Sequence, residues 1–141
     1  MQSRRRLIRF AHRGASALAP ENTFSAFREA AEHGCDWIET DVRLTSDLVP
    51  VLIHDERVDR TTGARGAVGK MTLRQVRRLD AGSWFGHRFR GERIPTLDEA
   101  LEWSRHRCGL NLEMKEEDRR EEAIHRVIRS VAAHAAADRV L

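Results

Sequence analysis

The apolar positions of the chain alternate between two periods, and this alternation predicts an α/β fold. Residues 7–11 and 37–42 have the apolar, β-branched and aromatic composition of strands. Between them, apolar residues recur at helical spacing up to Gly34, with Asn22 or Thr23 as the expected helix cap. A strand, a helix and a strand in this order indicate a parallel βαβ unit, which binds ligands beyond the carboxyl ends of its strands.

The next apolar run, 49–53, follows too closely for a helical crossover, so we expect it to return as an antiparallel hairpin. In the expected register, Asp41 lies opposite Leu52. Glu39 then lies opposite His54, which would bring a histidine beside two carboxylates. A slip of one residue would turn His54 to the other face of the sheet.

Residues 56–95 are rich in glycine and arginine and contain one short helical patch at 72–79. We expect this segment to be an insertion that leaves the main sheet. Its aromatic residues, Trp84, Phe85 and Phe89, either pack within the insertion or form an apolar lip over a site.

Two longer helices are expected in the rest of the chain. Thr96 with Glu99 predicts a capping box for a helix that ends near His106. Asp118 with Glu121 is expected to cap the second helix. The inner face of that second helix should comprise Ile124, Val127, Ile128, Val131 and Ala135.

A further strand is expected at 110–115, where apolar and polar residues alternate. Glu113 and Lys115 share its polar face and emerge together at the end of the strand. Residues 139–141 have the composition of the start of another strand.

Composition limits the class of protein. At 141 residues, of which 40% are hydrophobic, the chain can form one domain, 1–141, with a real core. Its 25 basic and 22 acidic residues give a net charge of +3 and are spread along the chain, so we expect no nucleic-acid binding. No segment resembles a signal peptide or a membrane span, so a cytoplasmic protein without stable membrane insertion is expected. Cys35 and Cys108 lack the spacing of a zinc site or a disulfide framework and are expected to be free thiols.

Two carboxylates are the first candidates for chemistry. Glu39 and Asp41 are two positions apart in a strand, so they project from the same face, roughly 7 Å apart. Two carboxylates at so short a distance either raise one another's pKa or surround a cation. Either a divalent metal lies between the two carboxylates, or one of them faces solvent at the end of the strand.

With these residues located, the sequence resembles the glycerophosphodiester phosphodiesterase family, whose fold is a TIM barrel with a small insertion near its mouth. The resemblance rests on four stretches in the family's order and spacing, which are AHRGASALAPENTFSAFREAAEHGCDWIETDV, LTSDLVPVLIHDERVDRTTG, RIPTLDEAL and NLEMK. They extend from about Ala11 to Lys115. The family's function would be metal-dependent hydrolysis of glycerophosphodiesters to glycerol 3-phosphate and an alcohol.

The resemblance implies a metal site at Glu39, Asp41 and Glu113. A site made only of carboxylates favours a hard cation, Mg²⁺ or Ca²⁺, over zinc. Glu113 and Lys115 could instead form a plain ion pair on one face of their strand. Asn22 is either a helix cap or a residue closer to the chemistry.

The resemblance also implies that His12 and His54 are the general acid/base pair. Histidines suit this role because they titrate near neutrality. Arg13 and Lys115 would hold the phosphate oxygens. The nucleophile would be water or a hydroxyl of the substrate itself. The remaining histidines are expected to be surface or packing residues, namely His33, His87, His106, His125 and His134.

Two departures from the family are visible. Leu48 occupies a hairpin position where the family usually has glycine, although leucine tolerates a positive φ poorly. A TIM barrel needs eight strands and roughly 200 residues or more, whereas three barrel strands, a hairpin and the start of a fourth barrel strand are expected here. The fold class is therefore α/β of the TIM-barrel type, apparently its N-terminal half.

Three functions are compatible with these features. The first is a phosphodiesterase acting on a small glycerophosphodiester. The second is a related enzyme on the same barrel that acts on a lysophospholipid. The third is a non-catalytic or truncated half-barrel that works only as a homo-oligomer or as part of a longer chain, because an open parallel sheet exposes an edge and an apolar layer.

Overall fold

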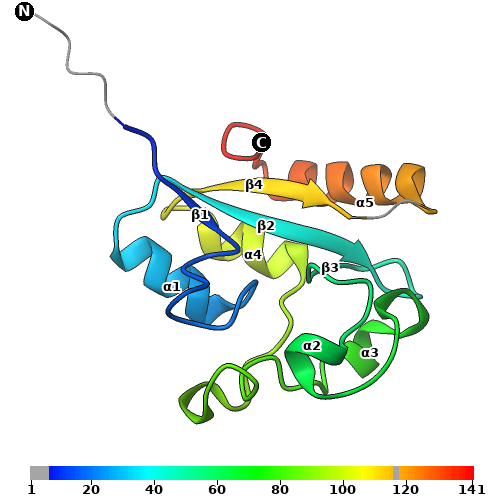
Figure 1. Cartoon of the computed structure of the whole chain (residues 1–141). Coiled ribbons are helices and arrows are strands. Elements are labelled where there is room, and N and C mark those ends of the chain that lie inside the picture. Colours follow the sequence, from blue (N-terminus) through cyan, green and yellow to red (C-terminus); the bar gives the residue numbers. More distant parts are fainter. Residues whose placement is uncertain (1–6, 116–117) are drawn as a thin grey trace, which may run out of the picture.

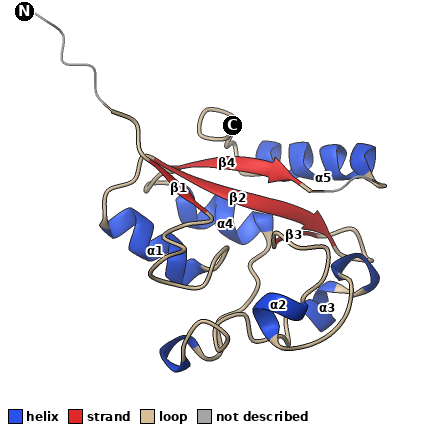
Figure 2. Cartoon of the chain, viewed as in Figure 1, coloured by secondary structure: helices blue, strands red, loops and turns tan. Residues whose placement is uncertain are grey.

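The computed structural model describes residues 7–115 and 118–141, and within them one mixed sheet carries helices and a looped segment (Figures 1 and 2). The strands are β1 (Phe10–His12), β2 (Trp37–Leu44), β3 (Pro50–Leu52) and β4 (Gly109–Met114). The α-helices are α1 (Phe24–Glu32), α2 (Asp59–Thr62), α3 (Leu73–Val76), α4 (Leu97–Ser104) and α5 (Arg120–Ala133). Short 3-10 helices occupy Val68–Lys70 and His87–Phe89.

Strand β2 is the centre of the sheet. β1 pairs with residues 37–39 of β2 in parallel, which confirms the predicted βαβ unit. β4 pairs in parallel with 37–42, and β3 pairs antiparallel with 42–44. The carboxyl ends of β1, β2 and β4 therefore point to the same end of the molecule (Figure 1).

The expected hairpin exists, but its expected register is wrong by one residue. Leu52 pairs with Val42 and not with Asp41. The pairing of Glu39 with His54 is absent as well, because β3 ends before His54. His54 therefore lies in the chain that leaves the hairpin rather than in a strand.

The cause of this shift is the turn. Leu48 adopts φ +62°, and its N–H donates to the carbonyl of Thr45 at 3.1 Å. A turn followed by a left-handed residue adds one residue to the loop compared with a two-residue turn. The left-handed position is the one where the family usually has glycine, and here leucine adopts it.

The caps of the two helices on the main sheet agree with the sequence. Thr23 caps α1 by accepting from the N–H of Ala26, and Gly34 follows the helix with φ +72°. Thr96 and Glu99 form the predicted capping box of α4. These caps depend on residues three apart in sequence, so no tertiary information is needed to predict them.

The cap predicted for the last helix is wrong. The N-cap position of α5 is Arg119, one residue after Asp118, and no side chain caps the helix. The guanidinium of Arg119 instead donates to the carbonyls of Leu44 and Thr45, at 2.9 and 3.0 Å. This contact joins the start of α5 to the β2–β3 hairpin.

Two hydrophobic clusters form the core. The larger cluster lies between the sheet and helices α1 and α4, and its largest fully buried members are Phe27, Ile38, Leu52, Leu97, Leu101 and Leu110. The smaller cluster joins β3 to residues 56–95 and includes Val51, Val58, Val68, Val76 and Ile94. Burying β-branched and leucine side chains contributes about 1.5–3 kcal/mol for each residue.

The face between β4 and α5 is uncovered. Ile128 is 60% exposed and Met114 is 37% exposed, although both were predicted to lie on apolar faces. The carbonyls of Arg139 and Leu141 pair with β4, so a further parallel strand does begin there. A groove of about 410 Å³ remains, lined by Leu112, Met114, Val127, Ile128, Val131, Ala132, Ala137, Val140 and Leu141.

The two cysteines are free thiols at the amino ends of β2 and β4. Burial is the main cause that raises the pKa of Cys108, to about 12, and the neighbouring Cys35 raises it further. Among residues 7–115 and 118–141, no helix combines the length and the apolar character required to cross a bilayer.

Candidate active site

Three carboxylates converge at the carboxyl ends of β2 and β4. Glu39 and Asp41 share a face of β2, and Glu113 is the register neighbour of Asp41 on β4. One oxygen from each carboxylate lies within 4.8 Å of the others. The site therefore follows from strand alternation and from in-register parallel pairing.

Asn22 holds the central carboxylate in place. Its side-chain amide donates to Asp41 Oδ2 at 2.9 Å, and its carbonyl accepts from the hydroxyl of Thr40 at 2.7 Å. Asn22 is 3% exposed and has φ +56°. Since Thr23 already caps α1, Asn22 is not the cap.

Two of the carboxylate oxygens are buried without a hydrogen-bond donor among the described residues, namely Glu39 Oε1 and Asp41 Oδ1. Burial, and then the charge of Asp41, raise the pKa of Glu39. A buried oxygen that lacks a donor is costly unless a cation supplies the missing charge. The donor set therefore fits a hard divalent cation bound by Glu39, Asp41 and Glu113.

Two basic residues border the same site. Arg13 Nε lies 3.2 Å from Asp41 Oδ2, and the backbone N–H of Arg13 donates to Glu39 Oε2 at 3.0 Å. Lys115 Nζ lies 3.5 Å from Asp41 Oδ1 and also contacts Glu113. The ion pair considered for Glu113 and Lys115 is present, and it raises the pKa of Lys115.

The two candidate acid/base histidines contact different carboxylates. His12 Nε2 is 3.7 Å from Glu39 Oε2, and the His12 side chain is 68% exposed. His54 Nδ1 is 2.8 Å from Asp55 Oδ1. The pKa of Glu113 is lowered mainly by its hydrogen bond from Lys115. One imidazole thus neighbours Glu39, and the other neighbours Asp55.

Two other histidines have local backbone contacts at helix ends. His33 Nδ1 lies 2.8 Å from the carbonyl of Glu29, and His134 Nδ1 lies 2.9 Å from that of Ser130. Both positions agree with the prediction that these histidines are surface or packing residues.

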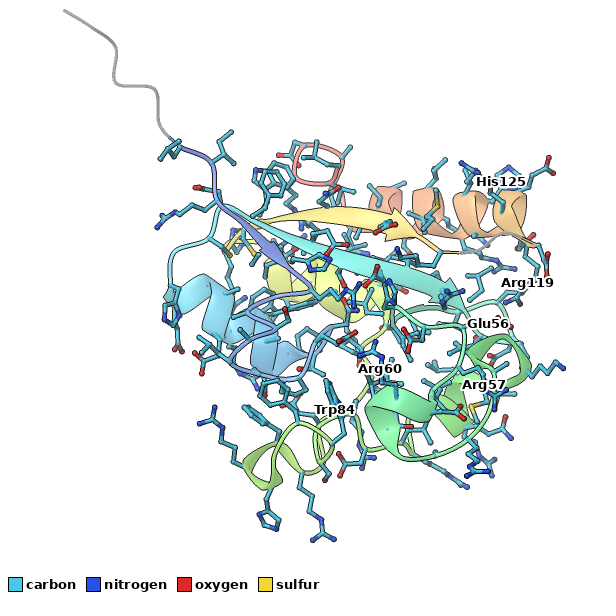
Figure 3. The ribbon with its side chains drawn as sticks, viewed as in Figure 1. Glu56, Arg57, Arg60, Trp84, Arg119 and His125 are labelled. Atoms are coloured by element: carbon cyan, nitrogen blue, oxygen red, sulfur yellow. The ribbon has the colours of Figure 1, made fainter. Side chains whose placement is uncertain are left out.

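A polar cavity of about 450 Å³ opens beside Lys115, at the end of the molecule where Figure 3 labels Glu56 and Arg119. Its walls carry both signs of charge. The charged residues that line it are Arg43, Glu56, Lys70, Lys115, Asp118 and Arg119. The cavity is large enough for a small polar molecule, and it meets the carboxylate site at Lys115, since Glu39, Asp41 and Glu113 do not line it.

Comparison with known proteins places this arrangement in context. A family model described as the glycerophosphoryl diester phosphodiesterase family matches residues 12–140. A glycerophosphodiester phosphodiesterase of Caldanaerobacter subterraneus is 56% identical over 92 residues, which are 65% of this chain and 38% of that protein.

Solved structures agree with the family model. The crystal structure of a glycerophosphodiester phosphodiesterase from Agrobacterium tumefaciens matches 95% of this chain and 56% of its own, with 41% identity and a TM-score of 0.86. A phosphodiesterase of Oleispira antarctica, in complex with the product sn-glycerol-3-phosphate, matches 91% of this chain and 53% of its own, with 42% identity and a TM-score of 0.87. The present fold is thus part of a TIM barrel. The chain spans 43% and 38% of the length of the first two curated relatives.

Proposed function

Because this chain belongs to the glycerophosphoryl diester phosphodiesterase family, we propose that it hydrolyses a glycerophosphodiester to glycerol 3-phosphate and an alcohol with the help of a divalent cation. The observation that carries the proposal is the convergence of Glu39, Asp41 and Glu113 within 4.8 Å. The product complex of the Oleispira antarctica relative supports a small glycerol phosphate ligand.

The cation proposed is Mg²⁺ or Ca²⁺, held by Glu39, Asp41 and Glu113. When bound, such an ion supplies Lewis acidity and positive charge next to a phosphate oxygen. Arg13 and Lys115 add two further positive charges on the same side, and both contact Asp41. These charges stabilise the negative charge that increases on the phosphoryl oxygens in the transition state.

His12 and His54 are proposed to move the protons. A phosphodiester is cleaved when one base takes a proton from the nucleophile and one acid gives a proton to the leaving alkoxide. The nucleophile is water or the neighbouring hydroxyl of the substrate. The two imidazoles lie beside different carboxylates, Glu39 for His12 and Asp55 for His54, and this supports a separate role for each.

The test is release of glycerol 3-phosphate from glycerophosphocholine and glycerophosphoethanolamine, with Mg²⁺ or Ca²⁺ and then with chelator. We expect turnover that chelator abolishes and that His12→Asn or His54→Asn lowers by at least about 100-fold. His33→Asn is the matched control, because this exposed histidine contacts only helix α1. Turnover that survives chelator, or that persists in His12→Asn, would overturn the proposal. Lysophosphatidylcholine serves as a further substrate, to detect a lysophospholipid phosphodiesterase.

A second candidate is a half-barrel that acts only as a homo-oligomer, and the groove between β4 and α5 is the observation that favours it. We propose that a second copy of this chain covers the groove. The opposite edge of the sheet also exposes apolar side chains, with Ile8 62% and Phe10 52% exposed. Three parallel strands and the start of a fourth from each of two copies would supply the eight strands of a closed barrel.

Light scattering coupled to size exclusion tests this pairing. We expect a dimer for the parent chain and a monomer for Ile128→Glu, which places a charge in the apolar groove. Leu18→Glu is the control, since Leu18 is 44% exposed and lies outside the groove. A monomeric parent would overturn the pairing, and so would a larger species that Ile128→Glu does not dissociate.

We further propose that residues 1–141 form one domain and that 56–95 are an insertion within it. The separate hydrophobic cluster between β3 and this segment supports the proposal. Residues 1–6 and 116–117 lie outside the described part of the chain.

A further inference from the structure

A charged network extends outward from the site to Arg60 on helix α2. The Arg60 guanidinium donates to both oxygens of Asp55, at 2.7 and 3.0 Å. It also donates to both oxygens of Glu21, at 2.9 and 2.8 Å. One guanidinium thus makes two bidentate pairs with carboxylates from two separate segments. Bidentate pairs fix orientation as well as distance.

The first arm of this network leads to His54. Asp55 Oδ1, which accepts from Arg60, also lies 2.8 Å from His54 Nδ1. An aspartate carboxyl is an anion at neutral pH, and the hydrogen bond from Arg60 lowers the pKa of Asp55 further. An ionised carboxylate only accepts hydrogen bonds, and Nδ1 must therefore carry the proton. The other ring nitrogen, Nε2, remains free for proton transfer.

The second arm leads to Arg13. Glu21 Oε1 accepts from Arg13 Nη1 at 3.1 Å as well as from Arg60. Arg13 in turn places its Nε 3.2 Å from Asp41. The hydrogen bond from Arg60 also lowers the pKa of Glu21. The arm therefore fixes the guanidinium that borders the carboxylates.

Arg60 belongs to residues 56–95 and not to the main sheet. In Figure 3 the Arg60 side chain lies where that segment meets the ends of the strands, with Trp84 nearby. The guanidinium carbon is 6.0 Å from the centre of the Trp84 ring. Without Arg60, Asp55 would lose its guanidinium partner and Glu21 would keep only the contact with Arg13 among the described contacts in this network, so repulsion between the two carboxylates would move both arms.

We infer that Arg60 is a positioning residue that orients His54 through Asp55 and Arg13 through Glu21, and so couples the proton-transfer group to the phosphate-binding group. The inference rests on the proposed phosphodiesterase function. It predicts that substitutions in the two arms change different kinetic constants. Asp55→Asn should lower kcat with little change in KM, whereas Glu21→Gln should raise KM with little change in kcat.

Arg60→Gln should affect both quantities, lowering kcat by about tenfold to a hundredfold and raising KM severalfold. Arg60→Lys keeps a charge but cannot form two bidentate pairs, so it should restore only part of the loss. The matched control is Arg57→Gln, which removes an arginine near the same short helix whose guanidinium pairs with Asp59. Arg57→Gln should resemble the parent in kcat and KM.

The decisive measurement is heteronuclear NMR of the His54 ring nitrogens, which reports the tautomer without any turnover. We expect the Nδ1–H tautomer in the parent and in Arg57→Gln. Arg60→Gln should show a mixture with the Nε2–H form, and Arg60→Lys should show an intermediate population. An unchanged Nδ1–H tautomer in Arg60→Gln, or parental kcat and KM in this variant, would overturn the inference. An inactive parent would instead count against the proposed function, because the NMR comparison needs no activity.

Discussion

Residues with left-handed backbone surround the proposed site. Arg13, Gly14 and Asn22 have φ values of +57°, +77° and +56°, and all three lie between β1 and α1. Strain of this kind persists only where neighbouring contacts enforce it. Here the backbone N–H of Arg13 binds Glu39, and Asn22 binds Asp41. The strained loop therefore places Arg13 and Asn22 against the two carboxylates of β2.

Gly14 is required in this loop for steric reasons as well. A Cβ at Gly14 would lie 2.7 Å from the backbone carbon of Ala26 in α1. We expect Gly14→Ala to lower the free energy of unfolding by about 2–4 kcal/mol in urea denaturation. Gly63→Ala is the control, because Gly63 has φ +69° but no atom within 4 Å of its Cβ position. Its expected loss is about 1 kcal/mol, and equal losses in the two variants would contradict the steric explanation.

Glu39 offers a second prediction at the scale of a residue. Burial and the charge of Asp41 raise its pKa, so the ionised side chain disfavours the metal-free fold at pH 7. Glu39→Gln should therefore have a higher Tm than the parent in chelator at pH 7. Below the ordinary carboxyl pKa of 4.5, Glu39 is protonated in both the folded and the unfolded state, and the difference in Tm should disappear.

The same pair of proteins also separates stability from cation binding. Added Mg²⁺ or Ca²⁺ should raise the Tm of the parent but not that of Glu39→Gln. A Glu39→Gln protein that is less stable than the parent in chelator at pH 7 would contradict the account of a strained buried charge.

Among the elements, the β2–β3 hairpin shows where prediction from sequence reaches its limit. Strands and helix caps follow from residues two to four apart, and these were predicted for β2, β4, α1 and α4. The hairpin register depends on whether Leu48 accepts a left-handed conformation, and local propensity argues against it. The structure adopts φ +62° there, and the pairing shifts by one residue.

This conformation leads to a test at the scale of the hairpin. Leu48→Gly should be more stable than Leu48→Ala by about 1 kcal/mol, because only alanine retains the cost of the left-handed backbone. Both variants lose the leucine side chain, so their difference isolates the backbone term. Urea denaturation measures it. A Leu48→Ala protein at least as stable as Leu48→Gly would argue against the observed turn.

At the scale of the whole molecule, the sequence predicted which residues meet but not what connects them. Strand alternation located Glu39 and Asp41 on one face, and the family resemblance added Glu113. The contacts of Asn22 with Asp41, and of Arg60 with Glu21, join segments whose relative position depends on the tertiary fold. No local pattern reports such contacts, and they were found only in the structure.

The partial barrel also explains the uncovered face. The predicted inner stripe of α5 includes Ile128, which remains 60% exposed because no described element packs on it. Relatives of this chain are about twice as long, and the chain covers 56% and 53% of two of their structures. The site itself lies on β1, β2 and β4, away from that face.

Cation binding by the three carboxylates is the central claim, and calorimetric titration with Mg²⁺ and Ca²⁺ tests it most directly. The variant combines Glu39→Gln, Asp41→Asn and Glu113→Gln. The control carries the same change of charge at the exposed residues Glu32, Glu102 and Glu121. We predict one cation per chain for the parent and for the control, with affinity at least about tenfold weaker in the site variant. Equal binding by the site variant and the control would contradict the assignment of the site.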